Sequence, residues 1–83
     1  MTEKEIITGK KEAIALYYYE MWIEDKEENP SCYEFLKTRK AKLQESKVIS
    51  KTESRRAIKI LSDMMREAYE IECLMESGNL LSI

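Results

Sequence analysis

Apolar residues recur every three to four positions across residues 52–77, and this spacing predicts one long helix. Its apolar arc covers roughly 200° of the helix surface, whereas a helix that packs on one neighbour needs little more than about 100°. That width indicates contact with two other helices. Ser50 and Glu53 match a capping box at the helix start, and Gly78 followed by Asn79 is typical of a helix end.

Residues 3–27 predict a first helix with apolar stripes on two nearly opposite faces. Gly9 costs up to about 1 kcal/mol against Ala in a helix, so the alternative is a helix that begins only near Lys10. One stripe is expected to enter the core and contains Ile7, Ile14, Tyr18, Met21 and Trp22. The other stripe contains Leu16, Tyr19 and Ile23.

Three consecutive tyrosines, Tyr17 to Tyr19, sweep about 200° of helix surface, so they cannot all enter one core. At least one of them should be exposed or lie at an interface. The second stripe can pack against the apolar tail at residues 80–83. Alternatively, it can be a surface that binds a partner protein or a second copy of the chain. Tyr, Trp and Met are enriched at such interfaces, and the candidate partner-binding residues are Leu16, Tyr19, Trp22 and Ile23.

Residues 31–46 are predicted to form a second helix. Ser31 and Glu34 match another capping box at its start, directly after Asn29 and Pro30. Arg39 falls within its apolar arc, where its stem can lie along apolar surface or its guanidinium can pair with Glu72. The apolar stripe itself is thin and consists of Cys32, Phe35, Leu36 and Leu43.

Three helices joined by short loops predict a single all-α domain over residues 1–83, arranged as an up-down-up bundle. In the second loop, Val48 and Ile49 are expected to pack inward. A long helical hairpin that completes its core by dimerising is the alternative architecture, and a chain this short gains stability from self-association.

The net charge of −2 conceals a segregation along the chain. Residues 1–29 carry four Lys/Arg and eight Asp/Glu, residues 30–59 carry nine and three, and residues 60–83 carry one and five. In an up-down-up bundle the basic residues meet at one pole and the acidic residues at the other. The basic pole is a candidate surface for nucleic acid or for an acidic partner through Lys37, Lys40, Lys42, Arg55, Arg56 and Lys59.

The composition argues against an enzyme and against a bound metal or cofactor. The chain has no His for proton transfer near neutral pH, and its two Gly exclude a phosphate-cradling loop. Cys32 and Cys73 have no zinc-site spacing and are expected to be small buried thiols, with a disulfide between them as the alternative. No apolar run is long enough for a membrane span and no signal peptide is evident, so a cytoplasmic location is expected.

These patterns favour a non-enzymatic protein–protein interaction module, an accessory regulator or inhibitor of a larger cytoplasmic assembly in a cell or a phage. The expected partners are another protein and a second copy of the chain, with no membrane and no small-molecule substrate. A regulator that binds nucleic acid through the basic pole is the alternative.

Overall fold

A computed structural model describes residues 2–77, and every regular element in this part of the chain is helical. The helices are α1 (Glu3–Ile7), α2 (Lys11–Asp25), α3 (Cys32–Glu45) and α4 (Lys51–Ser77). The prediction of an all-α protein is confirmed. Across residues 2–77 no helix combines the length and the apolar character that crossing a bilayer needs. The predicted helix end at Gly78 and Asn79 and the apolar tail at 80–83 lie outside the described residues.

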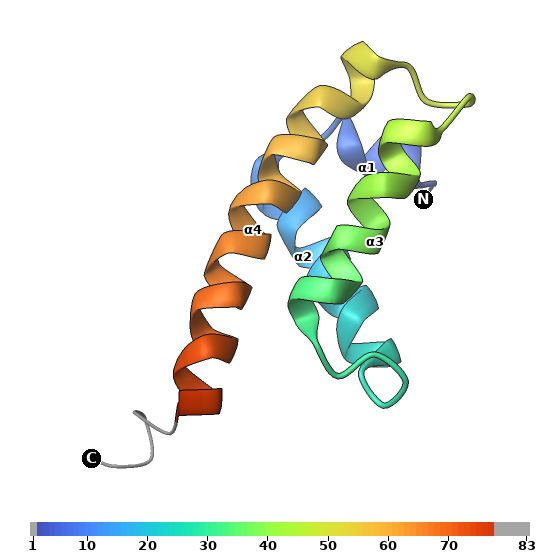
Figure 1. Cartoon of the computed structure of the whole chain (residues 1–83). Helices are drawn as coiled ribbons and strands as arrows, with labels where there is room; N and C mark the ends of the chain where they lie inside the picture. Colours follow the sequence, from blue (N-terminus) through green and yellow to red (C-terminus); the bar gives the residue numbers. More distant parts are fainter. Residues whose placement is uncertain (1, 78–83) are drawn as a thin grey trace.

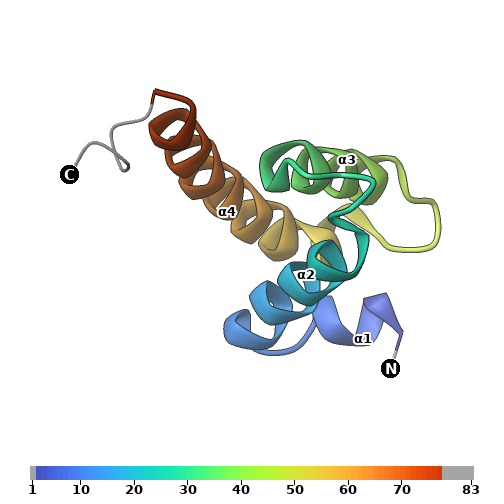
Figure 2. The same cartoon turned by 90° about the horizontal axis from the view of Figure 1, so that it is seen from below.

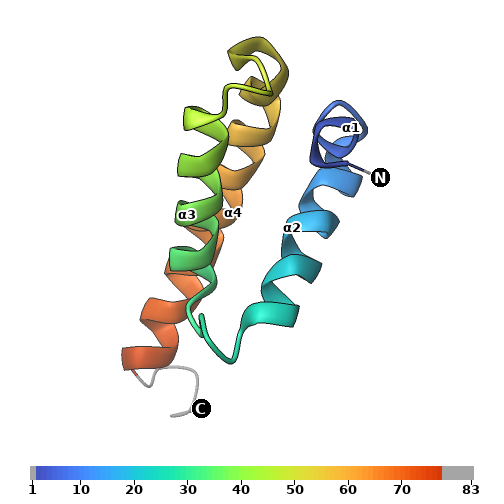
Figure 3. The ribbon, with the colours of Figure 1, turned by 90° about the vertical axis from the view of Figure 1, so that its right-hand side faces the viewer.

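The helices alternate in direction, with α3 antiparallel to both α2 and α4 (Figure 3). The contact between α3 and α4 is the most extensive in the molecule, and α2 makes smaller contacts with each of them. The start of α2, the end of α3 and the start of α4 therefore lie at the same end of the molecule (Figure 1). That placement brings the basic middle of the sequence to one end.

The prediction of one continuous helix over residues 3–27 is wrong, because the helix is interrupted between α1 and α2. The alternative, a helix that begins near Lys10, agrees with the start of α2 at Lys11. The Thr8 hydroxyl donates to the carbonyls of Lys4, at 3.2 Å, and Glu5, at 2.9 Å, which closes α1. The Gly9 carbonyl accepts a hydrogen bond from Arg56 of α4. A Cβ added at Gly9 would lie 3.2 Å from the Ile6 carbonyl oxygen, so glycine fits this close turn. The turn sets α1 at an angle to α2 (Figure 2).

The core draws on all four helices and on the loop before α4. The predicted inward stripe of α2 is confirmed, since Ile14 and Tyr18 are fully buried and Met21 and Trp22 pack against the core. In the loop, the prediction holds for Ile49 and is wrong for Val48, which is 82% exposed. The buried apolar residues are Ile7, Ile14, Tyr18, Phe35, Leu36, Leu43, Ile49, Ala57, Ile60 and Leu61.

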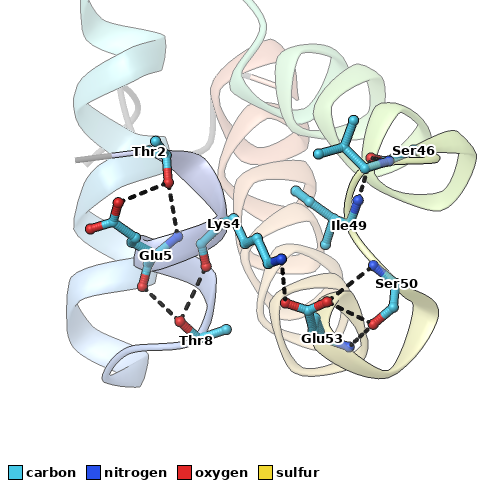
Figure 4. Close-up of polar contacts among 9 residues, drawn as sticks. Thr2, Lys4, Glu5, Thr8, Ser46, Ile49, Ser50 and Glu53 are labelled. Carbon is cyan, nitrogen blue, oxygen red and sulfur yellow. Dashed lines mark hydrogen bonds and ion pairs between the residues drawn. The ribbon is translucent and has the colours of Figure 1, made fainter.

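A capping box begins α4, as predicted (Figure 4). The Glu53 backbone N–H donates to Ser50 Oγ at 3.1 Å, and the Ser50 N–H donates back to Glu53 Oε1 at 3.4 Å. Lys4 of α1 approaches the same carboxylate, with 3.6 Å between its Nζ and Glu53 Oε2. Ser46 Oγ accepts from the backbone N–H of Ile49, which turns the loop toward the core. These contacts join α1 to the start of α4.

Arg39 does not pair with Glu72, and that prediction is wrong. Its guanidinium lies 3.3 Å from Glu3 Oε2, and the Tyr18 hydroxyl donates to the same oxygen at 2.8 Å. Burial, followed by the hydrogen bond to Glu3, raises the pKa of Tyr18 far above its ordinary value of 10.0, so the phenol remains a donor even in alkaline solution. The cluster ties α1, α2 and α3 together.

Candidate protein-binding groove

The helices are packed closely at one end of the molecule and diverge at the other. We call residues 2–18 and 36–63 the closed end and residues 19–35 and 64–77 the open end. The second half of α4 diverges from the loop that joins α2 to α3 (Figures 1 and 2). The space between them forms a groove with a volume of about 660 Å³.

One wall of the groove comes from the end of α2 and the start of α3. The Trp22 indole N–H donates to the carbonyl of Asn29 at 2.9 Å, which holds the ring beside the loop. The rings of Trp22 and Tyr19 lie 6.0 Å apart between centroids. This wall consists of Tyr19, Trp22, Pro30, Ser31, Cys32 and Leu36.

The other wall is the second half of α4. Four of its apolar residues follow the 4-3-4 spacing of a coiled-coil seam, in which the side chains of one helix receive those of another. Ile71 is 54% exposed and Met75 is 60% exposed, so this part of the apolar face has no partner helix in the described chain. The seam consists of Met64, Ala68, Ile71 and Met75, and the carboxylates of Glu67, Glu72 and Glu76 complete the wall.

Glu72 joins the two walls at the start of α3. Its carboxylate accepts the Ser31 hydroxyl at 2.6 Å and the Tyr33 backbone N–H at 3.0 Å. Ser31 Oγ in turn accepts the Glu34 N–H at 3.2 Å, which is the helix cap that the sequence predicts. A carboxylate at a helix N-terminus is favoured by the exposed N–H groups and the helix dipole, so Glu72 acts as a second cap.

Cys32 is partly buried and Cys73 is exposed, so the prediction of two buried thiols is wrong for Cys73. Partial burial, followed by the charge of Glu72, raises the pKa of the Cys32 thiol above 9.0, so the reactive thiolate is scarce at neutral pH. Within residues 2–77, no three acidic or Cys side chains come together as a metal site would require. What the groove offers is apolar surface with carboxylates at its edge.

The predicted partner-binding stripe divides between the groove and the adjoining surface. Tyr19 and Trp22 line the groove. Leu16 and Ile23 are 55% and 43% exposed and lie on α2 outside the groove lining. All three residues of the second stripe are exposed, since Tyr19 is 47% exposed. Packing of this stripe on the tail at 80–83 concerns residues outside the described part.

The predicted basic residues lie on α3 and on the first half of α4. Arg56 reaches across to the carbonyl of Gly9, on the side of α4 that faces the turn between α1 and α2. Lys40 lines a shallow hollow between α3 and α4 with Arg66, Tyr33 and Tyr69. The rings of Tyr33 and Tyr69 lie 5.4 Å apart between centroids. The exposed members of the predicted set are Lys37, Lys42, Arg55, Arg56 and Lys59.

Sequence reasoning did not identify the α4 wall of the groove as a binding surface. Its seam lies on the same apolar arc as the buried residues Ala57 and Leu61, and the arc has one periodicity throughout. The available signal was length, since α4 has 27 residues and α3 has 14. A helix nearly twice as long as its neighbour cannot be covered along its whole length.

No family model, curated protein or solved structure matches this chain.

Proposed function

We propose that this protein is a non-enzymatic interaction module, an accessory regulator or inhibitor that binds a larger protein assembly in the cytoplasm. The observation that carries the proposal is the apolar groove of the open end, where Ile71 and Met75 are more than half exposed. Contiguous apolar surface rimmed by polar groups is typical of protein interaction sites. Tyr19 and Trp22 supply the aromatic side chains that often dominate binding energy.

The proposed unit is an up-down-up bundle of α2, α3 and α4, with α1 covering one end. The close pairing of α3 with α4 also suits the rival, a helical hairpin that completes its core by dimerising. Self-association through the stripe Leu16, Tyr19 and Ile23 stays a prediction, and it separates these architectures. In the bundle, the stripe is a binding surface; in the hairpin dimer, it is part of the core.

The test changes Leu16, Tyr19 and Ile23 together to Gln. Because these side chains are 43–55% exposed, we expect unchanged helicity by circular dichroism and loss of self-association in sedimentation equilibrium. The control changes Lys11 and Ala13 together to Gln. These two residues are exposed on the same helix but lie outside the stripe. Loss of helicity in the triple variant would show that the stripe is core. Self-association equal to that of the unchanged chain would remove the stripe from the proposal.

Nucleic-acid binding is the second candidate, and the hollow that joins Lys40 and Arg66 to Tyr33 and Tyr69 favours it. Basic side chains beside aromatic rings can hold phosphates and stack bases. If this function is correct, binding to duplex or single-stranded DNA weakens steeply with salt and falls when Lys40 and Arg66 become Ala. Absence of binding at about 50 mM salt would eliminate it.

A further inference from the structure

We propose that the groove accepts an amphipathic helix from a different protein, with Lys and Arg on both sides of the apolar ridge of that helix. The inference rests on the proposed function, because it names the partner of the same surface. Three features of the described chain lead to it: the spacing of the α4 seam, the charge of the open end, and the absence of a matching surface on this chain.

The shape of the groove suits a helix. Met64, Ala68, Ile71 and Met75 present apolar side chains in the 4-3-4 pattern that receives the ridge of another helix. Trp22 and Leu36 close the opposite wall. Helices that dock in such grooves insert apolar residues at i, i+3 or i+4, and i+7, which is the periodicity that the seam itself presents.

The charge of the groove selects a basic helix. Its lining includes three carboxylates and no Lys or Arg. Glu67 and Glu72 flank the seam, where the polar residues of a bound helix would meet them. The carboxylate of Glu72 already accepts two hydrogen bonds, whereas the carboxylates of Glu67 and Glu76 have no hydrogen bond or ion pair within residues 2–77. A Lys or Arg stem can lie on the apolar wall while its charged group reaches these carboxylates.

The surrounding surface strengthens the same preference. The open end carries two Lys/Arg and ten Asp/Glu, whereas the closed end carries twelve and six. A net charge of −8 around the groove, set against +6 at the far end, orients an approaching basic segment and speeds its association.

A second copy of this chain does not provide the complementary helix. Its own α4 would place Glu67 and Glu72 against the same carboxylates, and like charges across an interface are unfavourable. Its basic segment, residues 36–63, has Val48 as its one large exposed apolar side chain, and Val48 lies in a loop. The exposed apolar stripe of its α2 has Glu12, Glu20 and Glu24 as charged neighbours, so that stripe would also bring carboxylates to the groove. The basic part of this chain presents no apolar ridge, and the fitting helix belongs to another protein.

The test uses two synthetic peptides of about 18 residues, with Leu in the same 4-3-4 pattern and either Lys or Glu at every flanking position. Trp22 is the only Trp of the chain and lines the groove, so its fluorescence reports binding of peptides that lack Trp. We expect the Leu/Lys peptide to bind the full chain at least about tenfold more tightly than the Leu/Glu peptide, with a preference that shrinks at high salt.

Two variants localise the effect. Changing Glu67 and Glu76 together to Gln should remove most of the preference for the Leu/Lys peptide while leaving Glu72 to cap α3. Changing Glu27 and Glu28 together to Gln is the matched control, because these residues share the acidic open end but do not line the groove. An equal loss in both variants would assign the preference to overall charge and overturn the role of the groove.

The other outcomes separate the two proposals. Equal binding of both peptides, or tighter binding of the Leu/Glu peptide, would overturn the basic partner and leave the interaction module standing. If neither peptide changes Trp22 fluorescence at about 1 mM, both proposals are overturned. Binding that appears only after deletion of residues 78–83 would assign the groove to the tail of this chain. A dimer that Ile71→Ala converts to a monomer would assign it to a second copy, and each of these results also overturns the inference.

Discussion

The two halves of α4 have the same apolar periodicity but different surroundings. In the closed end, Ala57 and Leu61 are fully buried beneath α2 and α3. In the open end, Ile71 and Met75 continue the same arc, and more than half of each side chain is exposed. An amphipathic pattern therefore shows which face of a helix can be buried, whereas the positions of the neighbouring helices determine how much of that face is buried.

Charge follows the same division. The closed end is held by polar contacts between helices, including the pair of Lys4 with Glu53 and the cluster of Glu3, Tyr18 and Arg39. The open end has one corresponding link across its helices, the contacts that Glu72 makes at the start of α3. We therefore interpret the closed end as the part that stabilises the fold and the open end as the part that remains available for binding.

The largest expected difference between the two ends is in packing. Leu61→Ala should lower the free energy of unfolding by about 2–5 kcal/mol, because it leaves a cavity in the fully buried core. Ile71→Ala should lower it by less than about 1 kcal/mol, since that side chain is already half in water. Urea unfolding with an unchanged m-value measures both. Similar losses for the two variants would mean that the seam is core, and the groove would have to be reinterpreted.

Neighbouring tyrosines give the next comparison. Tyr18→Phe removes a buried hydroxyl that donates to Glu3, so we expect a loss of about 1–2 kcal/mol in unfolding free energy. Tyr19→Phe is the matched control at the adjacent position, where the side chain is exposed at the edge of the groove, and its effect should be within about 0.5 kcal/mol. Equal effects in the same urea experiment would show that the Glu3 cluster adds nothing to the closed end.

Local signals predicted most of the fold. The capping serines Ser31 and Ser50 mark the starts of α3 and α4, and the stripes of α2 divide into a buried and an exposed face as their spacing indicates. Contacts between distant residues could not be predicted in this way. The break at Gly9 is supported by Arg56, 47 positions away. Arg39 pairs with Glu3 and not with Glu72 because the turn between α1 and α2 brings the Glu3 carboxylate within 3.3 Å of the Arg39 guanidinium.

The site was predicted in part for the same reason. Tyr19 stands out in the sequence because the three consecutive tyrosines exceed what one helix face can bury, and Trp22 lies one helical turn beyond it. The seam of α4 carries no such excess, and its exposure follows from the divergence of the helices (Figure 1). Whether periodic apolar residues are core or binding surface is decided by tertiary geometry, which local spacing does not encode.

The smallest expected effect concerns the pH dependence of the closed end. The hydrogen bond from Ser50, followed by the positive charge of Lys4, holds the pKa of Glu53 below its ordinary value of 4.5. A carboxyl whose pKa is lower in the folded state adds stability above the pKa of the unfolded chain, and this stability is lost as pH falls through the folded pKa. Glu53→Gln should therefore lower the urea midpoint at neutral pH, and the difference in midpoint from the unchanged chain should shrink as pH falls below about 4.5.

The same change at Glu76, whose carboxylate has no hydrogen bond or ion pair within residues 2–77, is the control at the open end. If the midpoint difference for Glu53→Gln stays constant between pH 7 and about pH 3, the Ser50 cap does not depend on the carboxylate charge, and the closed end owes its stability to apolar packing.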